Sequence, residues 1–169
     1  MADKVKGLKK LNKAITKQFA QFGIDNVEYT GEYSFIYVDN KITFKITENT
    51  VEDKWFAEYV KERFDYKVKY PFVFSILHEV GHAQANDDIY GEVHDFCMEE
   101  KDRIIAEMEE ADAERSKELE WQYFNLPDEI MATAWAVKWC KANKKALKEL
   151  NDNCIKALYK FYEKNSVVE

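Results

Sequence analysis

Two of the three histidines in this 169-residue chain, His78 and His82, lie in the stretch Ser-Ile-Leu-His-Glu-Val-Gly-His-Ala-Gln over residues 75–84. If this stretch is helical, the two imidazoles are one turn apart on the same face and can reach a single zinc ion at about 2.0–2.1 Å. Glu79 follows the first histidine, so its carboxylate would lie beside the ion rather than on it. The spacing therefore predicts a zinc site with a carboxylate next to it.

Such a site has a definite chemistry. Bound zinc lowers the pKa of its water to about 7, which makes hydroxide available near neutral pH. That hydroxide can attack a carbonyl carbon while the ion stabilises the oxyanion, and Glu79 can carry the proton from the water to the leaving amine. The three residues His78, Glu79 and His82 thus point to hydrolysis of a peptide or amide bond.

A catalytic zinc site needs a third protein ligand and keeps one position open. Asp88 follows His82 by six residues, a spacing that some zinc enzymes use. The intervening position where those enzymes have glycine is Ala85, so the sharp turn back to the ion is not encoded here. The third histidine, His94, stands at the start of a charged segment and could be exposed.

A third candidate begins the segment Glu-Ile-Met-Ala-Thr-Ala-Trp-Ala over residues 129–136. Ala132 and Ala136 follow Glu129 on roughly the same side of a helix, and small residues on that side would let this helix approach the histidine helix closely. Its carboxylate could then reach the ion, although a glutamate in a first helical turn is also favoured by the helix dipole alone. We prefer Glu129 as the third ligand, with His94 and Asp88 as alternatives.

Hydrophobic periodicity predicts the elements that would position these residues. Residues 71–85 are predicted to form a helix with Pro71 in its first turn, and this helix is apolar on nearly every side, so we expect it to be buried. Two short alternating runs flank Asp39-Asn40 and predict a small antiparallel β-hairpin or sheet that packs on the histidine helix (Tyr33, Phe35 and Tyr37; Ile42, Phe44 and Ile46). Residues 66–70 alternate in the same way and suggest a short further strand.

Most of the remaining chain reads as helix. A first helix is expected to end at Gly23, a second to start at Thr50 as its cap, and residues 92–122 to form one long charged helix with a narrow apolar stripe. Asn125 and Pro127 are expected to cap and open the helix that carries Glu129. One or two more helices complete the chain.

Composition narrows the possible classes. Apolar residues make up 46% of the chain, with only five Gly and two Pro, which favours a mainly helical globular protein. A net charge of −7 argues against general nucleic-acid binding, and no stretch approaches the roughly 20 apolar residues that span a bilayer. The N-terminal residues lack the apolar run of a secretory signal. Three widely spaced cysteines resemble neither a disulfide framework nor a thiolate zinc site, so we expect a cytoplasmic protein.

The pieces His-Glu-Val-Gly-His and Glu-Ile-Met-Ala-Thr-Ala-Trp-Ala, preceded by a helix and a small hairpin, resemble the ImmA/IrrE-type metallopeptidases, which are zincins of the gluzincin kind. The resemblance covers roughly residues 30–140. It implies that His78, His82 and Glu129 bind zinc and that Glu79 is the catalytic base. The chain departs from that group in the 47-residue gap between His82 and Glu129, and in Thr133, where the group usually has Asn or Asp.

Much of that gap is an acidic segment: residues 92–120 carry twelve acidic side chains against four basic ones. We interpret it as a solvated amphipathic helix, with a lid or a docking surface for basic peptides as alternatives. Together these features predict one α+β, mainly helical zincin-like domain over residues 1–169, a Zn²⁺-dependent metallopeptidase that acts on a protein or peptide. The alternative is a non-catalytic, zinc-stabilised binding module, which would not need Glu79.

Overall fold

The computed structural model describes residues 2–29, 35–38, 41–44, 54–85 and 92–165. These residues form mainly helices, as the sequence predicts, together with one small sheet. The helices are α1 (Ala2–Phe19), η1 (Ala20–Phe22, a short 3-10 helix), α2 (Lys54–Phe64), α3 (Pro71–Ala85), α4 (Glu92–Glu110), α5 (Ala113–Phe124), α6 (Pro127–Ala142) and α7 (Lys144–Asn165). The strands are β1 (Asn26–Tyr29), β2 (Phe35–Val38) and β3 (Lys41–Phe44).

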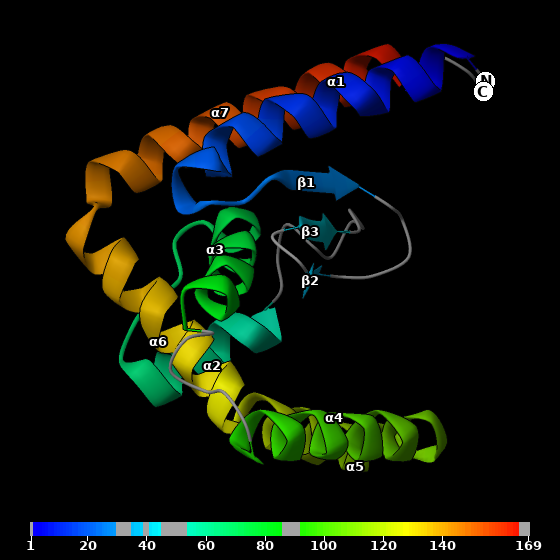
Figure 1. Cartoon of the computed structure of the whole chain (residues 1–169), viewed down its shortest axis with the longest axis vertical. Coiled ribbons are helices and arrows are strands. Elements are labelled where there is room, and N and C mark those ends of the chain that lie inside the picture. Colours follow the sequence, from blue (N-terminus) through cyan, green and yellow to red (C-terminus); the bar gives the residue numbers. More distant parts are fainter. Residues whose placement is uncertain (1, 30–34, 39–40, 45–53, 86–91, 166–169) are drawn as a thin grey trace.

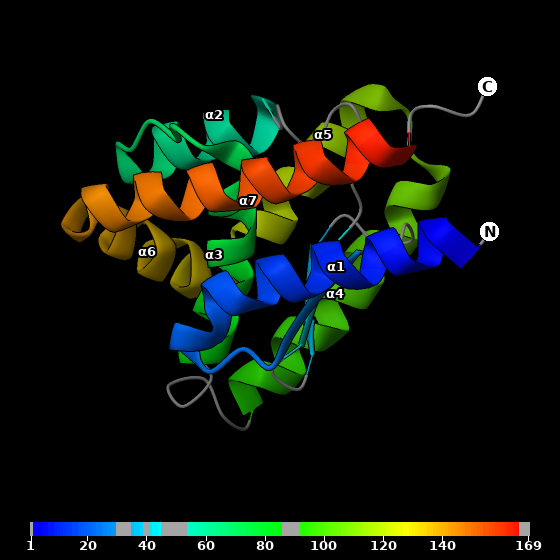
Figure 2. The same cartoon turned by 90° about the horizontal axis from the view of Figure 1, so that it is seen from above.

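Helix α3, which carries both histidines of the motif, lies in the middle of the molecule (Figure 1). The sheet lies on one side of it and α6 on the other, and α1 and α7 run side by side across one end. Helices α4 and α5 form an antiparallel pair at the opposite end, next to the start of α6. Seen from above, α1 and α7 again lie next to each other (Figure 2). The fold thus encloses α3 and leaves the α4–α5 pair at the edge.

The sheet has the strand order β1-β3-β2 and is mixed. Strand β2 pairs antiparallel with β3, with Phe35 opposite Phe44, whereas β1 pairs parallel with β3, with Asn26 opposite Lys41. Our prediction of an antiparallel sheet is therefore wrong for β1, which a crossover connection places beside β3. Residues 66–70 do not form the strand suggested above. Strand β2 contacts α3.

Several predicted helix boundaries can be compared with the structure. Gly23 follows η1 with φ of 78°, a left-handed conformation that suits glycine, so the predicted end of the first helix is confirmed. Residues 92–122 do not form one helix: the chain breaks at 111–112, where the Asp112 carboxylate caps α5 by accepting from the N–H groups of Glu114 and Arg115. The N-cap of α6 is Leu126, not Asn125, which ends α5. Thr50 lies outside the described residues.

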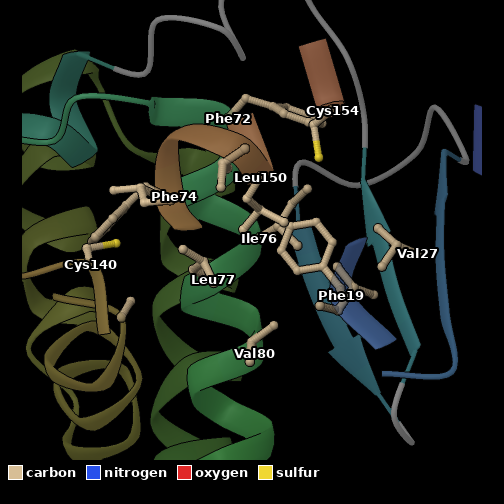
Figure 3. Close-up of a cluster of buried hydrophobic side chains, with 14 of the residues drawn as sticks. Phe19, Val27, Phe72, Phe74, Ile76, Leu77, Val80, Cys140, Leu150 and Cys154 are labelled. Atoms are coloured by element: carbon tan, nitrogen blue, oxygen red, sulfur yellow. The ribbon is translucent and has the colours of Figure 1, made fainter. Parts of the chain in front are cut away.

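The main hydrophobic core surrounds α3 (Figure 3). Phe19 of α1 and Val27 of β1 approach α3 from the side of the sheet, while Cys140 of α6 approaches from the other side. Side chains of α7 close the end near Phe72. A second, smaller cluster holds α4 and α5 together and reaches the start of α6 (Cys97, Ile104, Leu119 and Leu126). The histidine helix is therefore rigidly packed, and the α4–α5 pair has a core of its own.

Candidate metal centre

The polar residues His78 and Glu79 lie in a buried part of helix α3. Pro71 is its first residue, where a missing N–H costs no hydrogen bond, as the sequence predicts. Every residue from Phe72 to Gly81 is buried, so the helix has no solvent-facing side in its central turns. His78 is 4% exposed and Glu79 is 8% exposed. Polar side chains at such depth cost free energy unless they find partners, which makes their surroundings informative.

The partner of α3 is the first half of α6. Pro127 opens this helix, and Glu129 in its first turn is only 2% exposed. The two helices touch at Gly81 and Ala132: a Cβ atom added to Gly81 would lie 2.3 Å from the Ala132 carbonyl oxygen. Ala132 and Ala136 are both fully buried, so the predicted close approach of the two helices along these small residues is confirmed. The glycine inside the motif itself makes this approach possible.

This contact brings two imidazoles to one carboxylate. His78 Nε2 lies 3.0 Å from Glu129 Oε2, and His82 Nε2 lies 3.4 Å from Glu129 Oε1. Two ligand atoms bound at about 2.0–2.1 Å to one tetrahedral ion are about 3.3–3.4 Å apart. The observed separations are close to that edge length. These separations make His78, His82 and Glu129 candidate ligands of one metal ion.

A hydroxyl group fixes the orientation of His78. Thr133, fully buried one helical turn after Glu129, places its Oγ1 3.0 Å from His78 Nδ1. In this structure Nε2–H donates to the Glu129 carboxylate. When a metal occupies Nε2, the proton is carried by Nδ1, which can donate to the Thr133 oxygen. The ring of Phe56 packs edge-on against the His78 imidazole, with 5.3 Å between the two ring centres. Thr133 thus acts on His78 as a neighbouring hydrogen-bond partner does in known metal sites.

The carboxylate of Glu129 is held in its charged form. Burial alone would raise its pKa, but its hydrogen bonds and electrostatic interactions with His78 and His82 outweigh burial and hold the pKa well below its usual range. The ammonium group of Lys101 on α4 partly neutralises this negative site: Nζ lies 2.5 Å from Glu129 Oε1 and also pairs with Asp128. Negative charge at the point where the imidazoles converge favours a cation there.

Glu79 and Tyr123 are two further polar side chains next to the candidate metal site. Ligand atoms of His78, Glu79 and His82 lie within 4.8 Å of one another, as do those of His82, Asp128 and Glu129. The carboxylate of Glu79 is therefore close enough to act on a molecule bound at the imidazoles. Burial and the charges of Glu129 and Glu79 raise the pKa of Tyr123 above its usual range, so its hydroxyl stays protonated and can donate a hydrogen bond.

The structure brings together His78, Glu79, His82 and Glu129, and it separates His94 from them. His94 is exposed on α4 and belongs to neither group of closely spaced ligand atoms found among the described residues. Asp88 lies outside the described residues.

Sequence reasoning missed Lys101. A signal for it existed, because Cys97, Lys101, Ile104 and Met108 share one side of α4, and a lysine within an apolar stripe needs a buried partner. Thr133 was noted only as a departure from the family pattern, although its spacing of four residues from Glu129 places it on the same side of α6.

The state of the cysteines and the apolar character of the helices were also predicted from the sequence. Cys97, Cys140 and Cys154 are free and buried. Among the described helices, no helix combines the length and the apolar character needed to cross a membrane.

Searches with this chain against protein-family models, curated proteins and solved structures found no match.

Proposed function

We propose that this protein is a zinc-dependent metallopeptidase with His78, His82 and Glu129 as metal ligands and Glu79 as general base. One observation carries the proposal: two imidazole Nε2 atoms from α3 converge on the two oxygens of a single buried carboxylate from α6, at 3.0 and 3.4 Å. A buried His-Glu-His arrangement of this kind supplies three ligands and leaves one position for water or substrate.

The role of each residue follows from its position. A bound zinc ion would acidify its water and polarise the carbonyl group of a peptide. Glu79, adjacent to the ligand His78 on α3, would take the proton of the attacking water and deliver it to the nitrogen of the leaving amine. Thr133 would keep His78 in the tautomer that binds through Nε2. The protonated hydroxyl of Tyr123 could donate to a carboxylate or carbonyl oxygen at the site.

The remaining parts of the proposal are the substrate, the family and the compartment. The substrate class is a protein or peptide, and the family is the ImmA/IrrE-type group, on the strength of the two motifs and the way α3 and α6 pack. The free, buried thiols suit a reducing compartment, and we propose the cytoplasm.

Metal analysis tests the site. Purified protein is expected to bind about one zinc per chain, because two imidazoles and one carboxylate make one site. His78→Ala and Glu129→Ala should each lose zinc, whereas His94→Ala, a matched control that removes an exposed imidazole, should keep it. Absence of zinc uptake by the wild-type protein would exclude the proposed function.

Glu79→Gln tests catalysis separately from binding. Glutamine has nearly the same shape and should leave zinc content and folding unchanged, but it cannot accept a proton from water. Hydrolysis of a peptide library should therefore fall about 100-fold or more. Glu99→Gln on α4, an exposed position, controls for the loss of one negative charge. Equal cleavage by Glu79→Gln and the wild type would remove Glu79 as the base, and zinc binding without any cleavage would favour the non-catalytic module.

A further inference from the structure

Among the described side chains, Lys101 is the one lysine whose ammonium group contacts the carboxylate of Glu129. Its side chain is 12% exposed, an unusual depth for a lysine. The Nζ atom lies 2.5 Å from Glu129 Oε1, pairs with Asp128, and stands 5.2 Å from the centre of the Tyr123 ring. This ammonium group is thus enclosed by negative and aromatic partners at the same oxygen that faces His82.

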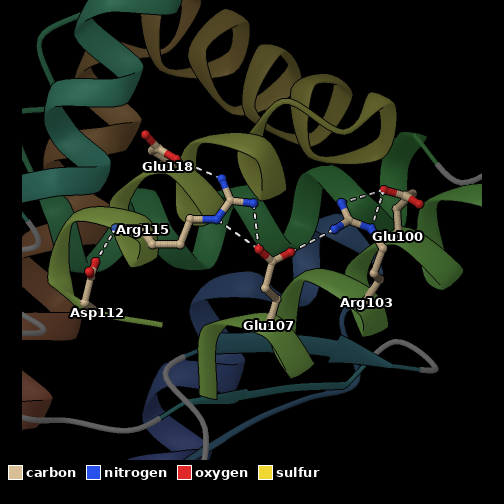
Figure 4. A network of polar contacts seen from close by, with 6 residues as sticks. All are labelled: Glu100, Arg103, Glu107, Asp112, Arg115 and Glu118. Atoms are coloured by element: carbon tan, nitrogen blue, oxygen red, sulfur yellow. Dashed lines mark hydrogen bonds and ion pairs between the residues drawn. The ribbon is translucent and has the colours of Figure 1, made fainter. Parts of the chain in front are cut away.

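Lys101 lies on α4, whereas the proposed ligands lie on α3 and α6. Helices α4 and α5 share a small core that also includes Leu126 at the start of α6, and Trp121 and Phe124 of α5 pack on aromatic side chains of α2. Helices α4 and α5 are also joined by a network of ion pairs in which Arg115 binds Glu107 of α4 and Glu118 of α5, while Arg103 binds Glu100 and Glu107 (Figure 4). The α4–α5 pair therefore holds together internally. Its contacts with the start of α6 include the ion pairs of Lys101 with Asp128 and Glu129.

A metal ion at the site would use the same carboxylate. Ions of like charge repel strongly at separations of a few ångströms inside a protein, even at an effective dielectric constant of about 20. A zinc ion bound to Glu129 and an ammonium group on the same carboxylate would be such a pair. The carboxylates attract the metal whether or not Lys101 is present, so the lysine can only make the potential at the site less negative.

We propose that Lys101 is a tethered cation that competes with the metal for Glu129, so that metal binding and docking of the α4–α5 pair oppose each other. This inference rests on the metal site proposed above. In the metal-free protein the ammonium group neutralises the buried carboxylate and fastens α4 to α6. Metal binding weakens that link, and by thermodynamic reciprocity the link weakens metal binding by the same factor.

The test compares zinc affinities, measured on metal-free protein by competition with a chromophoric chelator. Lys101→Met keeps the length and apolar stem of the side chain but removes the charge, and should bind zinc roughly 10–100-fold more tightly than the wild type. Lys101→Arg, which keeps the charge, should remain near the wild type. Lys117→Met is the matched control, since it removes an exposed lysine from the same helix pair and should change little.

Hydrogen exchange on the wild-type protein provides a second measurement that needs no variant to fold. Zinc should increase amide exchange in α4 while it slows exchange in α3 and α6. Tighter zinc binding by Lys101→Met, or faster exchange in α4 with zinc, supports the inference. Equal or weaker binding by a folded Lys101→Met, or α4 exchange that zinc slows or leaves unchanged, overturns it and leaves the metal site intact. Failure of every variant and the wild type to bind zinc would overturn both proposals together.

Discussion

Replacing Gly81 by alanine should disturb both the packing and the metal site. The added Cβ atom would lie 2.3 Å from the Ala132 carbonyl oxygen, and ordinary contact begins near 3.4 Å, so α3 and α6 must separate by about 1 Å at this point. The neighbouring atom belongs to the backbone of a buried helix and cannot swing aside as a side chain would.

Two opposing effects set the magnitude. Alanine in place of glycine inside a helix stabilises it by about 1 kcal/mol. Overpacking a close-packed core costs about 1–3 kcal/mol, and a clash with backbone belongs at the upper end of that range. The free energy of unfolding should therefore fall by about 2 kcal/mol, which corresponds to a decrease in Tm of about 4–8 °C for a chain of this size.

Thermal and urea unfolding of the metal-free protein measure this loss. Ala134→Gly, at an exposed position of α6, calibrates the helix-propensity effect and should cost about 1 kcal/mol. Zinc affinity should also fall, by about 10-fold or more, because metal–ligand distances tolerate only about ±0.2 Å. A Gly81→Ala protein that is more stable than the wild type and binds zinc equally well would refute the proposed contact between the helices.

Three other results are expected. Thr133→Val should lower zinc affinity about 10–100-fold, whereas Thr133→Ser should retain most of it, as measured by chelator competition, because only valine removes the oxygen beside His78 Nδ1. Thiol reagents at pH 8 should not modify the folded protein until denaturant is added, since burial raises the pKa of Cys140 to about 11 and that of Cys154 to about 12. For the same reason the free energy of unfolding should decrease as the pH rises from about 9 towards 11, because unfolded thiols lose protons that the folded ones keep. Urea titrations at pH 8 and pH 10 check this, and equal stability at both values would contradict it.

The sequence predicted the parts of the site that depend on local spacing. Two histidines one turn apart define a face of α3, and Pro71 and the apolar composition of that helix predict its start and its burial. The small residues Ala132 and Ala136 indicated that α6 could come close, and Glu129 followed from their position.

Other features depend on contacts between distant segments. The parallel pairing of β1 with β3 joins residues 26–29 to 41–44, and four residues are too few to show an alternating pattern. The break between α4 and α5 rests on Asp112 as a cap within a charged stretch that lacks glycine and proline. Lys101 pairs with Asp128 and Glu129, which lie 27 and 28 residues further along the chain. Only the folded structure therefore shows that this buried lysine is neutralised.

Location of bound zinc by anomalous X-ray scattering at the zinc absorption edge tests the central claim most directly. We predict a single strong peak per chain, about 2.0–2.1 Å from His78 Nε2, from His82 Nε2 and from a carboxylate oxygen of Glu129. A peak centred on other side chains, or no peak in crystals equilibrated with excess zinc, would contradict the proposed metal centre.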